Sequence, residues 1–203
     1  MLTDYEISMK LPAIKITRKS GDEPFISDEK NLGIFISDFW QWSSSDITGN
    51  ALRGILAEFI VASALEINRE VRIEWDAYDL TFDDIKIEIK SAAYIQTWEQ
   101  NDYSKITFNI APTRTWSDEA KSRIDEIKRQ SDIYIFCLLS HREQLTLNPL
   151  NIDQWEFYLL PTAYLDKYFP LQKTITLSSL LNLQPTKCNY NDLKSTMTKL
   201  IVS

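Results

Sequence analysis

Between positions 78 and 91 the chain reads Tyr-Asp-Leu-Thr-Phe-Asp-Asp-Ile-Lys-Ile-Glu-Ile-Lys-Ser. The second half alternates apolar and charged residues, as in a strand whose two faces differ. We expect Ile87 and Ile89 to face a core, and Glu88 and Lys90 to share the other face. If Asp79 reaches the same place, two carboxylates and a cation meet there, a set that suits Mg²⁺ better than Zn²⁺. The stretch therefore predicts parts for metal-assisted phosphodiester cleavage.

The acid-x-Lys triplet is not specific by itself, because it also begins at Asp28, Asp84, Glu119, Glu126 and Asp192. Two of these lie in the stretch 117–130, whose charges have helical spacing and predict a solvated helix. Only Glu88 lies on a clean alternating run with an aspartate shortly upstream. Context therefore selects Glu88 and Lys90.

Length and composition predict one ordinary globular domain. The chain has 203 residues, of which 44% are hydrophobic and 25% are charged. No apolar run approaches the roughly 20 residues that cross a bilayer, and residues 1–20 carry charges that a signal peptide lacks. Two cysteines make no disulfide framework. We expect a cytoplasmic location and no membrane partner.

Several other kinds of chemistry lack their residues. One histidine and two cysteines cannot build a zinc finger or a zinc deaminase site. Four glycines form neither a Walker loop nor a nucleophile elbow. The net charge of −7 argues against a broad basic surface that coats nucleic acid. It does not exclude a nuclease, because metal sites gather acidic residues and a local basic rim can still steer DNA.

A helix is expected from residue 51 to about 65, with Asn50 as its N-cap. Its apolar face at helical spacing comprises Leu52, Ile55, Leu56, Phe59, Ile60 and Ser63. Glu58 lies among apolar neighbours on this helix. It is either on a narrow wet stripe or buried with a partner, because a buried acid without one is costly. A metal ion, or water bound to one, is the partner this position favours.

The remaining elements follow from periodicity and turn residues. We expect an extended segment over 71–80, a hairpin turn at 81–84, strands at 85–94, 105–110 and 155–160, and a buried central strand at 132–140. Short helices are expected at 163–168, 177–181 and 192–201, and a peripheral strand within 1–20. Trp40 and Trp42 are more typical of core or lid packing than of a base-stacking platform.

An acidic helix, then strands carrying Asp and Glu-x-Lys, then a helix and a buried strand, resembles the PD-(D/E)XK nuclease superfamily. The resemblance covers about residues 50–139 and implies an α/β (α+β) fold: a restriction endonuclease-like core with a central mixed sheet flanked by helices. Residues 1–49 and 140–203 would be elaborations of one domain, 1–203. Asp79 matches the motif aspartate, Glu88 the second acid and Lys90 the lysine. Tyr78 stands where the motif has proline.

The resemblance also implies a division of labour. Asp79, Glu88 and the Ile89 carbonyl would hold Mg²⁺, with Mn²⁺ as a substitute, and Glu58 would act through water. Lys90 would serve as a base or as an electrostatic clamp. Arg53 and Gln96 would contact DNA, although a surface salt bridge and an amide cap explain them equally well.

The function expected first is a Mg²⁺-dependent DNA endonuclease of restriction or other defence type. It would act as a homodimer, or with a partner subunit or methyltransferase. A second possibility is a non-catalytic module that binds nucleic acid or protein on the same fold. A third is an interaction protein in which Glu88 and Lys90 are open to water and far from Glu58.

Overall fold

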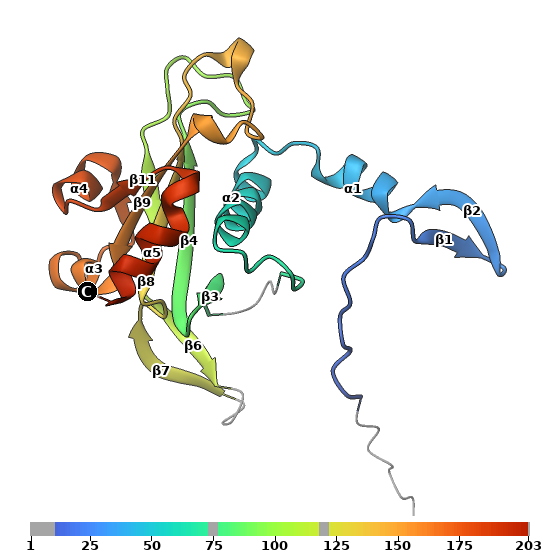
Figure 1. The fold of residues 1–203 in the computed structure, drawn as a ribbon, viewed down its shortest axis with the longest axis horizontal. Coiled ribbons are helices and arrows are strands. Elements are labelled where there is room, and N and C mark those ends of the chain that lie inside the picture. Colours follow the sequence, from blue (N-terminus) through green and yellow to red (C-terminus); the bar gives the residue numbers. More distant parts are fainter. Residues whose placement is uncertain (1–10, 73–76, 118–121, 203) are drawn as a thin grey trace, which may run out of the picture.

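The computed structural model describes residues 11–72, 77–117 and 122–202. Its centre is a five-stranded mixed sheet with the order β11-β9-β8-β4-β3 (Figure 1). The strands are β3 (Leu80–Phe82), β4 (Ile85–Ala93), β8 (Ile133–Leu139), β9 (Trp155–Pro161) and β11 (Thr186–Cys188). Strands β4 and β8 are parallel, and the other neighbours are antiparallel. The mixed sheet flanked by helices confirms the expected α+β class.

Strand β8 is the centre of the sheet. All seven of its residues are buried, which confirms the strand predicted from the unbroken apolar run. Ile133, Ile135 and Cys137 belong to the core on one face, and Tyr134 and Phe136 to the core on the other. The sheet is therefore covered on both sides here.

Helices α2 (Asn50–Ala64) and α5 (Leu193–Val202) cover one face of the sheet. The other face carries α3 (Thr162–Tyr168), α4 (Leu177–Asn182) and a small sheet of β5 (Thr107–Asn109) and β10 (Thr174–Thr176). Single 3₁₀ turns lie at η1 (Gln144–Thr146), η2 (Ile152–Gln154) and η3 (Tyr190–Asp192). No helix in the described parts of the chain is long and apolar enough to span a membrane.

Helix α2 begins one residue earlier than expected and is rotated from its predicted face. Gly49 is the N-cap, so the prediction of Asn50 in that role is wrong. Small and medium residues, above all Ala57 and Val61, face the sheet and allow the helix to approach it closely. Ile55 and Phe59 of the predicted apolar face are instead 40% and 53% exposed.

A two-residue turn, Asp83-Asp84, connects β3 to β4. Asp83 and Asp84 have φ angles of 49° and 65°, the left-handed values that both central residues of a type I′ turn require. The four-residue turn predicted at 81–84 is therefore too long, because Thr81 and Phe82 lie in β3. Of the extended segment predicted at 71–80, residues 73–76 lie outside the described residues and 77–79 form a bend before β3.

The helix predicted at 117–130 is wrong. A two-stranded antiparallel sheet of β6 (Thr113–Ser117) and β7 (Ser122–Lys128) occupies this region. Helix propensity is a weak preference that cross-strand pairing overrides. The two threonines at positions 113 and 115 were a strand signal that the charge spacing obscured.

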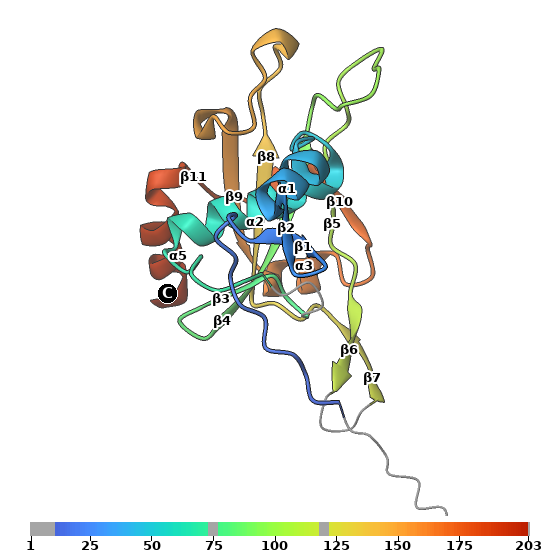
Figure 2. The same cartoon turned by 90° about the vertical axis from the view of Figure 1, so that its right-hand side faces the viewer.

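Residues 11–45, here called the N-terminal arm, project from the rest of the chain (Figures 1 and 2). The arm contains a hairpin of β1 (Pro24–Ser27) and β2 (Lys30–Phe35), followed by α1 (Ile36–Ser44). The predicted peripheral strand is wrong for residues 11–20, which have no regular structure, and residues 1–10 lie outside the described residues. Trp40 and Trp42 are 39% and 85% exposed, so they are not core residues.

Candidate active site

Asp79 is held against the edge of β4 by two hydrogen bonds. Its N–H donates to the Ile87 carbonyl at 3.0 Å, and its carboxylate Oδ2 accepts from the Ile89 N–H at 2.6 Å. The N–H and C=O of one strand residue point to the same edge. The Ile89 carbonyl therefore lies at the edge where Asp79 is, as a shared metal site requires.

Glu88 and Lys90 form an ion pair on one face of β4. The Lys90 ammonium donates to Glu88 Oε1, and the two side chains are 26% and 19% exposed respectively. Ile87 and Ile89 are 0% and 6% exposed and face the core that α2 covers, which confirms the predicted alternation. The pair is thus partly shielded and not an open, solvated strand face.

Glu58 extends from α2 and binds Arg72. The guanidinium makes two contacts with the carboxylate, one of them from Nη2 to Oε1 at 3.0 Å, and only 13% of the Glu58 side chain is exposed. Of the two alternatives for this acid, burial with a partner is the one observed. The described partner is a guanidinium from the segment after the helix.

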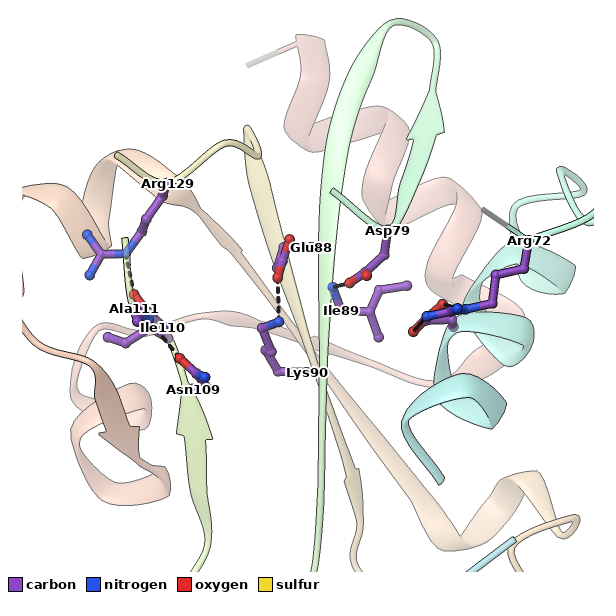
Figure 3. Close-up of polar contacts among 10 residues, drawn as sticks. Arg72, Asp79, Glu88, Ile89, Lys90, Asn109, Ile110, Ala111 and Arg129 are labelled. Carbon is purple, nitrogen blue, oxygen red and sulfur yellow. Dashed lines mark hydrogen bonds and ion pairs between the residues drawn. The ribbon is translucent and has the colours of Figure 1, made fainter. Parts of the chain in front are cut away.

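Asp79 lies between these two ion pairs. Figure 3 shows Arg72 on one side of it, and Glu88 and Lys90 on the other side of β4. Burial, first, and then the negative charges of Glu88 and Glu58 raise the pKa of Asp79 to about 6, against the lowering effects of the Ile89 N–H and of Lys90. Strand β4, helix α2 and the bend before β3 thus bring three carboxylates and a lysine within electrostatic reach of one another.

The donor set fits a hard divalent cation. No group of three or more His, Cys, Asp and Glu side chains that could hold a metal is found among the described residues. Mg²⁺ does not need such a group, because it is usually bound by one or two carboxylates and keeps several waters. Asp79, Glu88 and the Ile89 carbonyl supply oxygens of that kind, and a cation bound there would offset the burial and the neighbouring acids that raise the pKa of Asp79.

A cavity of about 800 Å³ opens beside Asp79. Asp79, Glu58 and Arg72 lie in its wall, together with residues 16–20 of the N-terminal arm. Apolar and aromatic side chains complete it, among them Trp40 and Phe59. Asp79 and Glu58 are therefore reachable from a hollow large enough for a substrate segment, whereas Glu88 and Lys90 do not line it.

The structure places Arg53 and Gln96, the two residues predicted to bind substrate, in a buried polar network. Arg53 is 3% exposed and donates to Ser91 Oγ (3.1 Å), the Thr48 carbonyl (2.9 Å), Gln96 Oε1 (3.1 Å) and Asn50 Oδ1 (2.6 Å). All four partners are neutral groups. The network ties the start of α2 to the end of β4, and a role for Arg53 in binding DNA stays a prediction.

Gln96 is 8% exposed, and its side chain is likewise hydrogen-bonded within the chain. Its amide nitrogen donates to the Ala93 carbonyl at 2.8 Å and to Ser104 Oγ at 3.2 Å, while its oxygen accepts from Arg53. These contacts fix the chain as it leaves β4. Substrate binding by Gln96 likewise stays a prediction.

Two arginines that the sequence did not single out take part in the surroundings of the site. Arg72 is 14 residues beyond Glu58, a separation that no helical or strand rule connects. Arg129 lies on the same side of β4 as Glu88 and Lys90 (Figure 3) and donates to the Ile110 carbonyl at 2.8 Å and to Asp166 at 2.6 Å. Neither contact has a local sequence signal, because both are made only when distant segments meet.

Comparison with known proteins places the chain in a family of nucleases. No curated protein sequence matches it. The family model described as bacteriophage T4 endonuclease IV matches residues 36–179, from the first residue of α1 into α4. The match spans the central sheet except β11, and includes Glu58, Arg72, Asp79, Glu88, Ile89 and Lys90. Because the matched region is well over half of the chain, this protein belongs to the bacteriophage T4 endonuclease IV family.

Proposed function

We propose that this member of the family is a Mg²⁺-dependent DNA endonuclease whose site is formed by Asp79, Glu88 and Lys90, with Glu58 beside them. The observation that carries the proposal is the raised pKa of Asp79 together with its causes. Unless a ligand binds here, the repulsion among Glu58, Asp79 and Glu88 lowers the stability of the fold. Such crowding of acids is typical of functional sites.

The proposed roles follow from position. Asp79 and Glu88 would hold the ion with the Ile89 carbonyl, and Glu58 would act on it through water. When bound, the ion polarises the scissile phosphate and lowers the pKa of its water. Lys90 orients the attacking water and offsets negative charge that develops on the phosphate oxygens. Arg72 holds the Glu58 carboxylate in place through two contacts.

Membership of the PD-(D/E)XK superfamily is part of this proposal. The acidic helix α2, the hairpin β3–β4 with Asp79, Glu88 and Lys90, and the buried strand β8 in parallel with β4 support it. The predictions of a defence role and of a partner subunit or methyltransferase rest on the resemblance alone and stay predictions.

The test is cleavage of plasmid DNA, intact and heat-denatured, by the purified chain with Mg²⁺, with Mn²⁺ and with EDTA. We expect cleavage with either ion, none with EDTA, and none by Asp79→Ala or Lys90→Ala. Lys86→Ala is the matched control, because Lys86 lies on the same strand and the same face but is exposed. Metal-independent cleavage, or full activity of Lys90→Ala, would overturn the proposed mechanism.

A second candidate is a non-catalytic module that binds DNA on the same fold. It is favoured by one observation: Glu88 and Glu58 are each already paired with a cation of the same chain. In that case well-folded protein would bind DNA without cutting it, and Lys90→Ala would leave the binding curve unchanged. Fluorescence anisotropy with labelled DNA, run beside the cleavage assay, separates the two functions.

A further inference from the structure

We propose that the N-terminal arm is a dimer contact and that its occupant is a second copy of this chain. The arm of each copy packs against the arm and α2 of the other around a two-fold axis. This inference goes beyond the proposed function, and its test needs neither metal nor DNA, although the arm lines the same cavity as Asp79 and Glu58.

The arm exposes an unusual amount of apolar surface. Ten of its large apolar side chains are between 39% and 85% exposed: Leu11, Ile14, Ile16, Phe25, Ile26, Leu32, Ile34, Phe39, Trp40 and Trp42. Among residues 11–45, only Gly21 is buried, and α1 has no buried residue. A monomer in water would therefore leave this whole segment without a core.

The secondary structure of the arm needs outside support. A lone two-stranded hairpin such as β1–β2 is marginally stable in water. Helix α1 has nine residues, too few to persist without packing. Within its own chain, the arm is fastened by Arg18, whose guanidinium donates to the carbonyls of Asn68 (3.1 Å) and Arg69 (3.4 Å). That contact anchors one point and buries none of the apolar residues.

The surface that faces the arm is incomplete in the same way. Ile55 and Phe59 of α2, 40% and 53% exposed, line the cavity of about 800 Å³ together with Ile16 and Trp40 of the arm. Because apolar side chains line both sides of this open cavity, apolar side chains placed between them would remove that surface from water. A second copy supplies such side chains from its own arm, and a two-fold axis makes the exchange reciprocal.

Area favours a copy of this chain as the occupant. Residues 11–20 contain Lys15, Arg18 and Lys19 and no acid, so this part of the arm is attracted to an acidic body, whereas residues 21–45 carry five acids and one lysine. Ten large side chains at about half exposure offer on the order of 800 Å² per copy, which is the size of a stable interface. DNA would satisfy the cations but would leave the apolar residues in water.

The experiment is sedimentation velocity of the full chain without DNA or metal, from about 1 to about 100 µM, a range that spans micromolar affinities. The test variant is Phe39→Ser with Trp42→Ser. The control is Leu145→Ser with Leu171→Ser, two residues of the body that are 94% and 87% exposed. We expect dimers of the unaltered chain and the control, and at least tenfold weaker association of the arm variant.

Circular dichroism keeps the result interpretable, since none of the four substituted residues is buried and all variants should keep the native spectrum. A monomeric unaltered chain at about 100 µM, or an arm variant that dimerises as well as the control, would overturn the proposal. So would dimerisation that appears only when DNA is added. Because neither metal nor DNA is needed, a failure here is distinct from a failure of the nuclease proposal.

Discussion

Two polar groups that lie beside strand β4 differ in how their charge is balanced. Nearer the start of the strand, Asp79 accepts one hydrogen bond from Ile89 but lies near two further acids, and its pKa is raised to about 6. At its end, Arg53 is more deeply buried, yet its guanidinium makes four hydrogen bonds to neutral acceptors. The Arg53 guanidinium, whose hydrogen bonds are satisfied, stabilises the fold. The Asp79 carboxylate is repelled by neighbouring acids and is therefore suited to bind a cation.

The largest expected effect is on cleavage at the start of the strand. Lys90→Ala should lower the rate by at least about 10²-fold, because it removes a charge that acts on the transition state. The unfolding midpoint should change little, since the Glu88–Lys90 ion pair is partly exposed. Single-turnover cleavage and thermal unfolding measure the two effects. Lys86→Ala, the control, should leave both unchanged.

The next effect is on stability at the end of the strand. Arg53→Ala should destabilise the chain by about 3 kcal/mol, because four acceptors, of which the Gln96 oxygen is buried and the others partly buried, lose their donor at once. Urea unfolding measures this, with Arg69→Ala as an exposed control that should change stability by less than about 0.5 kcal/mol. Equal effects of the two substitutions would show that the buried network does not stabilise the fold.

The third effect concerns the pH dependence of stability. The folded pKa of Asp79, about 6, is above the ordinary value of 3.8, so its contribution is present below pH 3.8 and is lost as the pH rises through 6. Asparagine cannot ionise, so Asp79→Asn does not lose stability as the pH rises. At pH 8 the variant should be more stable than the unaltered chain by up to about 3 kcal/mol, the free energy of a pKa shift from 3.8 to about 6. The difference should vanish near pH 3.5.

Urea unfolding in EDTA at several pH values tests this third prediction. Asn keeps an acceptor for the Ile89 N–H, so the substitution changes the charge and not the hydrogen bond. Added Mg²⁺ should narrow the difference at pH 8, because it would stabilise the chain that has the carboxylate. A variant less stable than the unaltered chain at pH 8 would contradict the assigned cause.

The smallest effect is expected at Glu58. Glu58→Gln keeps the side chain's shape and a hydrogen bond to Arg72, so stability should change by about 1 kcal/mol or less. Cleavage should fall by about tenfold, less than for Lys90→Ala, because Glu58 acts through water. The same two assays measure it. A loss of cleavage as large as that of Lys90→Ala would place Glu58 in direct contact with the ion.

The sequence predicted the elements whose pattern is local. The alternation at 85–94 predicted that Ile87 and Ile89 are buried opposite Glu88 and Lys90. The apolar run predicted β8, and helical spacing predicted α2 to within a residue at each end. It failed at 117–130, where the charges have helical spacing. The two threonines just before this stretch, at 113 and 115, were a strand signal, and pairing between β6 and β7 decided the structure.

For the candidate site, sequence reasoning selected the acids and the lysine, but the tertiary structure decided their partners. Glu58 meets Arg72 because the chain turns back after α2, and Arg53 is buried because small residues let α2 lie close to β4. Neither follows from spacing along the chain. The catalytic roles stay predictions that the cleavage assays address.

The sequence by itself therefore determined the alternating strand, its two charged residues and the aspartate that precedes them, because period and turn chemistry act over a few residues. Only the tertiary structure decided that Asp79 lies between two ion pairs, that Arg53 is enclosed by neutral acceptors, and that the N-terminal arm finds no core in its own chain. These depend on which distant segments meet and how much water they exclude, and burial and electrostatic energy are set at that level.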